Sequence, residues 1–178
     1  MGGSARRYKP YRAVPGTVYR TGHWGAALLA YAPLGYLLLR SDPILAFVGA
    51  GVVLWLSTLP DIDVRLPIRH RGPTHSLLFL GMVAAVLGAA GGALGLGTYQ
   101  PIGVLPGVGL GVLLGVVGIG SHLLADMLTP AGVNLFWPLP AESRSFYVAR
   151  ADNTLANYGL FGLGVTASVG VLYLAGLA

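Results

Sequence analysis

The sequence predicts an all-α, polytopic membrane protein with about five transmembrane helices. Hydrophobic residues make up 54% of its 178 residues and charged residues only 10%, against about 25% charged residues in a typical soluble domain. The mean hydropathy is correspondingly high, at +0.71. So few charges cannot cover the surface of a soluble globule of this size. The composition therefore disfavours a soluble enzyme and excludes a disordered chain.

The chain begins with a basic stretch that differs from the apolar remainder. Five basic side chains lie there: Arg6, Arg7, Lys9, Arg12 and Arg20. The apolar run that follows, Trp24–Leu29, is shorter than the roughly 7–15 residues of a secretory signal, so we expect no cleavage. The sequence predicts a cytoplasmic arm over residues 1–21 and a single helical membrane domain over residues 22–178.

Five apolar segments follow the arm. They are Gly22–Leu39, Pro43–Leu59, Ser76–Gly97, Gly103–Leu128 and Leu155–Leu177. A helix that crosses a bilayer takes about 20 residues, with a range of about 17–25, and the last three segments meet this length. The first two are short and are joined only by residues 40–42, so they form either a helical hairpin or a re-entrant pair. The hairpin is favoured, because the first segment reaches the lower limit once its polar ends are counted.

The distribution of basic residues predicts the orientation. If the N-terminus is cytoplasmic, ten of the 11 Lys and Arg residues lie inside and only Arg40 lies outside. Cytoplasmic loops of membrane proteins carry such an excess of positive charge. We therefore expect an inner-membrane protein with a cytoplasmic N-terminus, an odd number of crossings and an external C-terminus.

Small residues recur at helical spacing in two of the segments. Gly88 and Gly92 are four residues apart, as are Gly107, Gly111 and Gly115. This spacing lets helices approach closely in lipid, although a chain with 28 glycines also produces it by composition alone.

Histidines and carboxylates gather at the predicted cytoplasmic face. His23 opens the first segment, Asp61 and Asp63 follow the second, His70 and His75 precede the third, and His122 and Asp126 end the fourth. The chain has no cysteine, so a metal would take nitrogen and oxygen ligands. Imidazole and carboxylate suit Zn, Mn or Fe better than Ca. We expect a divalent transition metal, with Zn as the first choice, and the number of ligands allows one or two ions.

The local spacing supports this interpretation. His122 and Asp126 are four residues apart and share one helix face, where a cation would offset the cost of a carboxylate at membrane depth. Asp61 and Asp63 face opposite ways in an extended segment, so that one binds and the other orients a ligand. In a turn both could bind.

The stretch 70–76 forms a compact loop before the third segment. Thr74 is expected to cap the following helix, and the helix N-terminus is expected to keep His75 neutral and able to bind a metal. Only one of His70 and His75 need bind, since five positions separate them. Arg69 and Arg71 place cations beside the site that suit a phosphate.

Four motifs carry a family resemblance. They are His23, Leu-Pro-Asp-Ile-Asp at 59–63, His-Arg-Gly-Pro-Thr-His-Ser at 70–76, and Ser-His-Leu-Leu-Ala-Asp-Met-Leu-Thr-Pro-Ala-Gly-Val-Asn-Leu-Phe-Trp-Pro at 121–138. In these the chain resembles the YdjM-like, LexA-regulated family of membrane-bound metal-dependent hydrolases. The resemblance implies an integral membrane protein with a His/Asp metal centre and hydrolase chemistry. It does not identify the substrate. A more distant similarity to zinc-dependent, all-helical phospholipases C points towards phosphoesters.

The expected function is metal-dependent hydrolysis of a phosphoester or lipid-type ester at the cytoplasmic interface. The expected ligands are His23, Asp61, His75, His122 and Asp126, with His70 as a further candidate. Asp63 is expected to orient a ligand, to bind a second ion or to act as general base. Arg69 and Arg71 are expected to hold phosphate charge.

Two further expectations concern the partners and a loop. Residues 136–153 form either an interfacial loop or a lid, and in the lid Arg150 or Asp152 touches substrate. The expected partners are the lipid bilayer and a lipid or phosphoester substrate, and no nucleic acid.

The alternative function is a non-enzymatic metal-binding membrane protein, either a transporter or a scaffold with a structural ion. A transport path is disfavoured, because transporter sites lie near the bilayer midplane and these groups lie at helix ends.

Overall fold

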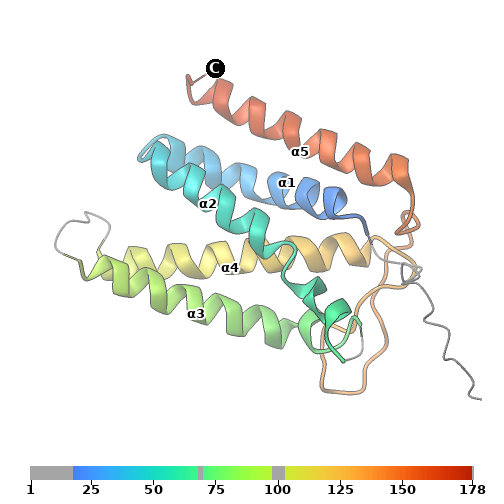
Figure 1. The fold of residues 1–178 in the computed structure, drawn as a ribbon. Coiled ribbons are helices and arrows are strands. Elements are labelled where there is room, and N and C mark those ends of the chain that lie inside the picture. The colour runs from blue at the N-terminus through green and yellow to red at the C-terminus, as the bar shows by residue number, and fades with distance from the viewer. Residues whose placement is uncertain (1–17, 68–69, 98–102, 178) are drawn as a thin grey trace, which may run out of the picture.

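The computed structural model describes residues 18–67, 70–97 and 103–177, and most of them are helical. Five α-helices follow one another: α1 (Arg20–Leu39), α2 (Pro43–Leu56), α3 (Leu77–Gly95), α4 (Val104–Met127) and α5 (Thr154–Leu174). Two short 3-10 helices, η1 (Pro60–Arg65) and η2 (Pro73–His75), lie between α2 and α3 (Figure 1). The predicted all-α architecture is confirmed. Most of the predicted basic arm, and Arg69, lie outside the described residues.

Side-chain caps explain where three of the helices begin. Asp42, Ser76 and Asn153 each accept a hydrogen bond from the backbone N–H three residues further on, at 3.0, 3.2 and 3.0 Å. Each cap satisfies a donor that the first helical turn leaves without a partner. The expectation that Thr74 caps α3 was wrong. Its hydroxyl instead donates to Asp63 at 2.9 Å, and the helix begins after Ser76.

Within the described residues, four helical segments are long and apolar enough to cross a membrane: Pro43–Arg65, Leu77–Gly95, Val104–Met127 and Thr154–Leu174. The first of these joins the 14 residues of α2 to η1. Helix α1 is also of membrane length, with 20 residues, but its first turns carry Arg20, Thr21 and His23. The first predicted segment is therefore the most polar of the five helices at its start, and that polar end lies at the site described below.

The helices run alternately in opposite directions (Figure 1). One end of the bundle therefore collects the starts of α1, α3 and α5 together with the ends of α2 and α4. Helix α1 packs against α2, α4 and α5, while α3 packs against α4. Helices α1 and α2 form the antiparallel hairpin that the sequence favours. The described chain begins at one end of the bundle and finishes at the other.

Glycines bring the backbones of α3 and α4 into contact. A Cβ atom on Gly107 would collide with the backbone of Gly91, and one on Gly115 would lie 2.6 Å from the Cα atom of Ala84. The predicted small-residue face of α4 is thus confirmed as a packing surface. The predicted glycines of α3, at 88 and 92, first meet valine side chains. The close approach holds the end of α4, with its histidine and aspartate, beside the start of α3.

A second close pair, α1 and α5, fixes the start of α1. A Cβ atom on Gly164 would lie 2.5 Å from the carbonyl oxygen of Gly25, so the two backbones touch there. The side chain of Asn157 in α5 accepts a hydrogen bond from the backbone N–H of Tyr19 at 3.0 Å. It also donates to the carbonyl of Ala151 at 2.8 Å. Helix α5 thereby positions the turn of α1 that carries His23.

Candidate metal centre

The structure brings histidines and carboxylates from four elements together at one end of the bundle. His23 comes from α1, Asp61 and Asp63 from η1, His75 from η2, and His122 and Asp126 from the last turns of α4. All of these are buried except Asp61, whose side chain is 29% exposed. The cluster is therefore open to its surroundings on the side of Asp61.

Two imidazoles face each other at the centre of the cluster. The Nε2 atoms of His75 and His122 lie 3.0 Å apart. The Nδ1 atom of His122 lies 2.7 Å from the carbonyl oxygen of Ser57. Because a carbonyl only accepts hydrogen bonds, this Nδ1 carries the proton and the Nε2 of the neutral ring presents a lone pair. The Nδ1 atom of His75 is likewise 3.2 Å from a carboxylate oxygen of Asp63, which directs its Nε2 towards the same point.

A carboxylate oxygen completes this arrangement. The Oδ2 atom of Asp126 lies 3.2 Å from Nε2 of His75 and 3.6 Å from Nε2 of His122, and it has no hydrogen-bond partner among the described residues. A buried oxygen left without a donor is costly. Two imidazole nitrogens and a carboxylate oxygen thus converge on one point, where they could hold a cation once the Nε2 of His75 has lost its proton.

The charge of His75 differs from the expectation. Burial lowers the pKa of His75, but the close contacts of its ring with the carboxylates of Asp126, Asp61 and Asp63 outweigh burial and raise the pKa to about 10. The expectation that His75 is neutral was therefore wrong for the site without a metal, because three carboxylates surround the ring. A metal at this point would have to displace that proton, as ligand binding to metals generally requires.

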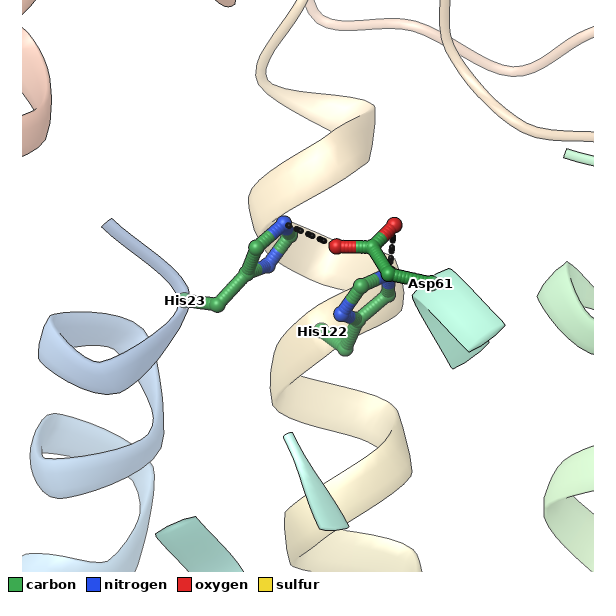
Figure 2. Close-up of side chains that lie close together, drawn as sticks. All are labelled: His23, Asp61 and His122. Atoms are coloured by element: carbon green, nitrogen blue, oxygen red, sulfur yellow. Dashed lines mark ion pairs between the residues drawn. The ribbon is translucent and has the colours of Figure 1, made fainter. Parts of the chain in front are cut away.

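Asp61 lies between His23 and His122 and contacts both (Figure 2). One carboxylate oxygen lies 3.7 Å from the Nε2 atoms of both His75 and His122, and the other lies 3.7 Å from Nε2 of His23. The ring of His23 stacks on that of His122 with centroids 3.9 Å apart. Both ring nitrogens of His23 are buried without a hydrogen-bond partner among the described residues, so this imidazole is poorly explained as a packing group alone.

Asp63 lies behind the central pair and organises the loop that carries His75. Its two oxygens receive His70 Nδ1 at 2.8 Å, the backbone N–H of Arg71 at 3.1 Å and the Thr74 hydroxyl at 2.9 Å, besides His75. Each contact ties the loop 70–75 to η1. Arg71 itself adopts a left-handed backbone, with φ of 59°, which is unusual for a residue with a side chain. The hydrogen bonds to Asp63 hold that turn.

The side chain of Arg71 reaches across to α4. One terminal nitrogen lies 2.7 Å from Oδ1 of Asp126. The other donates to the Thr129 hydroxyl at 3.2 Å and to the carbonyl of Gly132 at 3.1 Å. This contact occupies Oδ1 of Asp126 and leaves Oδ2 turned towards the imidazoles.

Of the remaining predicted residues, Arg150 lies away from the cluster and His70 lies at its edge. Arg150 lies on the surface, 80% exposed, and forms two contacts of 3.2 Å with Asp152. His70 is joined to the cluster through Asp63, and its Nε2 atom is buried without a hydrogen-bond partner in the described part of the chain. His70 and Arg71 also line a cavity of about 380 Å³. Its opposite wall includes Gly132, Asn134 and Trp137.

Two functional contacts could not be expected from the residue pattern. The carbonyl of Ser57 sets the tautomer of His122, and a backbone carbonyl leaves no signal in a sequence. The ion pair between Arg71 and Asp126 joins residues far apart in the chain, and only the packing of α3 on α4 brings them together.

The donor atoms of the described residues could hold a metal ion. Three overlapping groups have ligand atoms within 4.8 Å of one another: His23 with Asp61 and His122, Asp61 with His70 and His75, and His75 with His122 and Asp126. Nitrogen ligands at about 2.05 Å from a tetrahedral zinc ion lie about 3.3 Å apart, near the 3.0 Å between the two facing imidazoles. The described residues therefore offer a buried His/Asp cluster that could hold one ion or a pair.

Fold and site together define a helical membrane protein with a polar, buried His/Asp centre at one end of its bundle. Comparison with known proteins agrees. A family model described as YdjM inner membrane protein matches residues 19–177, and the chain belongs to this family. The resemblance that the motifs indicated is thereby confirmed.

Two curated relatives are both called inner membrane protein YdjM. They come from Escherichia coli (strain K12) and from Shigella flexneri, and each is 48% identical over 96 residues. The matched stretch covers 45% of this chain and 44% of each relative. The chain thus spans less than half the length of the curated relatives it matches. No solved structure matches it.

Proposed function

We propose that the protein is a membrane-embedded, metal-dependent hydrolase that acts on a phosphoester or lipid-type ester at the cytoplasmic interface. The observation that carries the proposal is the convergence of His75 Nε2, His122 Nε2 and Asp126 Oδ2 on one buried point. Two imidazole nitrogens and a carboxylate oxygen at this spacing suit a metal ion that displaces the proton of His75.

In this proposal His75, His122, Asp126, Asp61 and His23 hold one or two divalent ions, with Zn as the first choice and Mn or Fe as alternatives. His70 remains a further ligand candidate through the group it forms with Asp61 and His75. A transition metal held there would supply a water of lowered pKa and would polarise the oxygen of an ester.

The surrounding residues act by orienting these ligands. Asp63 accepts from His75 Nδ1 and turns Nε2 towards the centre, and its other contacts favour this role over direct binding or general base catalysis. Arg71 holds Asp126 in the same way. Its contacts favour orientation of the carboxylate over the phosphate binding expected of Arg71, while phosphate binding by Arg69 stays a prediction. Carboxylate and carbonyl partners of this kind commonly fix metal ligands.

Substrate would approach from the side on which the cluster is open. Among the ligand candidates Asp61 has the most exposed side chain, at 29% against 21% for His70, so a coordination position on its side would be accessible. The proposal places this end of the bundle at the cytoplasmic interface, because five of the six arginines in the described part of the chain lie there and only Arg40 lies at the other end. Arg150 and the lid expected over residues 136–153 remain candidates for substrate contact.

The burial of the ligands also supports the alternative function. His23, His75, His122 and Asp126 are almost fully buried, as in sites where an ion serves the structure alone. A non-enzymatic membrane protein with a structural ion would show the same burial. The two functions differ in whether a coordination position stays open.

The test is the metal content of the purified protein, measured by inductively coupled plasma mass spectrometry. The wild type is compared with His75→Ala and Asp126→Ala, and with Asp152→Ala as a matched exposed carboxylate outside the cluster. We expect one or two equivalents of a transition metal in the wild type and in Asp152→Ala, and a loss in the other two variants. Hydrolysis of phosphoesters and phospholipids is then assayed with that metal. The absence of bound metal after reconstitution with Zn, Mn and Fe would overturn the proposal, whereas metal without hydrolysis would favour the structural ion.

A further inference from the structure

The loop between α4 and α5 turns apolar side chains outwards. Six large apolar or aromatic side chains are exposed on it: Phe136, Trp137, Leu139, Phe146, Tyr147 and Val148. The three consecutive side chains at 146–148 are 59%, 73% and 67% exposed. Exposed apolar side chains of this kind suit contact with an apolar surrounding.

Hydrogen bonds hold this loop in a defined shape. The backbone N–H of Phe146 donates to the carbonyl of Met127 at 2.7 Å, and that of Val148 donates to Leu128 at 2.9 Å. Earlier in the loop, Val133 and Arg144 form an antiparallel bridge. The outward direction of the apolar side chains is therefore built into the fold.

The backbone at Tyr147 explains how three neighbours all face outwards. In an extended segment successive side chains alternate between two faces. Tyr147 instead has φ of 55°, in the left-handed region that residues with side chains rarely adopt. Its N–H donates to the hydroxyl of Ser145 at 3.1 Å, which stabilises the turn. A strained conformation kept in this way points to a use for the surface it creates.

The position of the loop in the fold indicates which partner contacts this surface. The loop leaves the end of α4 and returns to the start of α5, two helices of membrane length. It therefore lies at the level where the helices leave the hydrocarbon layer, and Figure 1 shows it extending sideways past the start of α3. Aromatic side chains concentrate at this level of a bilayer. The exposed Arg144 and Arg150 flank the apolar side chains and suit lipid phosphates.

We propose that residues 136–148 dip into the interfacial layer of the same membrane and bind its phospholipid surface. The apolar side chains enter the boundary between headgroups and acyl chains, and the flanking arginines stay among the headgroups. This binding does not depend on any catalytic activity of the cluster.

A consequence follows for the site, and this consequence rests on the proposed function. Asn134, Trp137 and Ser143 of the same loop line the cavity of about 380 Å³ whose other wall holds His70 and Arg71. A loop seated in lipid would place this cavity within reach of phospholipid headgroups. The substrate of the proposed hydrolase would then be a membrane phospholipid rather than a soluble ester.

The natural absence of cysteine allows each position to be labelled singly. Leu139→Cys and Tyr147→Cys report on the loop, and Glu142→Cys is a charged control in the same loop. Leu163→Cys, exposed on α5, is the reference for lipid contact. The full chain carries a nitroxide label in phospholipid nanodiscs, and collisions with oxygen and with a water-soluble nickel chelate are measured by electron paramagnetic resonance.

The expected result is that labels at 139 and 147 favour oxygen, as the label at 163 does, while the label at 142 favours the nickel chelate. Two loop positions are used because both side chains are exposed and neither is needed for the core. Equal nickel accessibility at 139, 142 and 147 would overturn the proposal. Dipolar broadening at 139 and 147 that disappears on dilution with unlabelled protein would also overturn it, in favour of a second copy of the chain. Neither result bears on metal content, so failure here is distinct from failure of the proposed function.

Discussion

The Nε2 atoms of His75 and His122 lie 3.0 Å apart although 47 positions separate the two residues in the chain. The second nitrogen of each ring is held by an acceptor, Ser57 for one and Asp63 for the other. The two rings therefore meet as a pair of neutral ligands only when a cation lies between them. The polar centre is thus also a packing contact between α4 and the loop before α3, and changes to it alter both metal binding and stability.

Replacing Asp63 tests whether it orients His75 or binds the metal itself. The Asp63→Asn variant keeps the shape but loses the charge that accepts from His75, His70 and Thr74. We expect metal affinity to fall about 10–100-fold, with full occupancy restored at high metal concentration. The measurement is a competition titration against a chromophoric chelator, with Asp152→Asn as the control. Loss of one whole equivalent at saturating metal would instead make Asp63 a direct ligand.

Replacing Arg71 separates orientation of Asp126 from phosphate binding. Lysine keeps the positive charge but cannot contact Asp126, Thr129 and Gly132 at once, because it lacks the planar fork of the guanidinium. We expect Arg71→Lys to lower the free energy of unfolding by about 1–3 kcal/mol and to weaken metal binding. Thermal unfolding in detergent and the chelator titration check this. Unchanged stability and metal affinity, with a raised KM for a phosphoester, would assign Arg71 to the substrate instead.

Two glycines of α4 provide a matched test of helix packing. A Cβ atom on Gly111 would collide with the backbone of Leu87 in α3, whereas Gly109 has nothing within 4 Å of its added Cβ atom. We expect Gly111→Ala to destabilise the protein by about 1–3 kcal/mol. Gly109→Ala should leave it unchanged or more stable by up to about 1 kcal/mol, since alanine favours the helix. Thermal unfolding of both variants decides the matter, and equal stabilities would contradict the close approach of α3 and α4.

The fold was largely predictable because hydropathy reports the length of each apolar segment. All five predicted segments correspond to helices. Helix α2 ends at Leu56 rather than at residue 59, and the 3-10 helix η1 follows from Pro60. The meeting of His23, Asp61, His75, His122 and Asp126 at one end followed from alternating helix directions. Hydropathy sets this alternation even when it says nothing about side-chain contacts.

The partners of individual side chains were less predictable, because they depend on tertiary packing. Thr74 was assigned to a helix cap, yet Asp63 competes for its hydroxyl. His75 was expected to be neutral from its place before a helix, yet three carboxylates from two other elements raise its pKa. In both cases the deciding group lies more than ten positions away or on another helix, and no local spacing shows it.

Removal of the metal distinguishes an ion that serves catalysis from one that serves the fold. A ligand that binds only the folded state adds RT ln(1 + [L]/Kd) to its stability, about 2.7 kcal/mol at a concentration 100 times Kd. If the ion serves catalysis, chelation should lower the thermal unfolding temperature by several degrees while the helical circular dichroism at 25 °C stays unchanged. Hydrolysis should stop and then return with added Zn. His122→Ala should show neither the shift nor the recovery, because it removes a central ligand. Loss of helical signal on chelation, without recovery on metal addition, would instead mean that the ion holds the bundle together, because His23, His75, His122 and Asp126 would then lie buried without the charge that stabilises them.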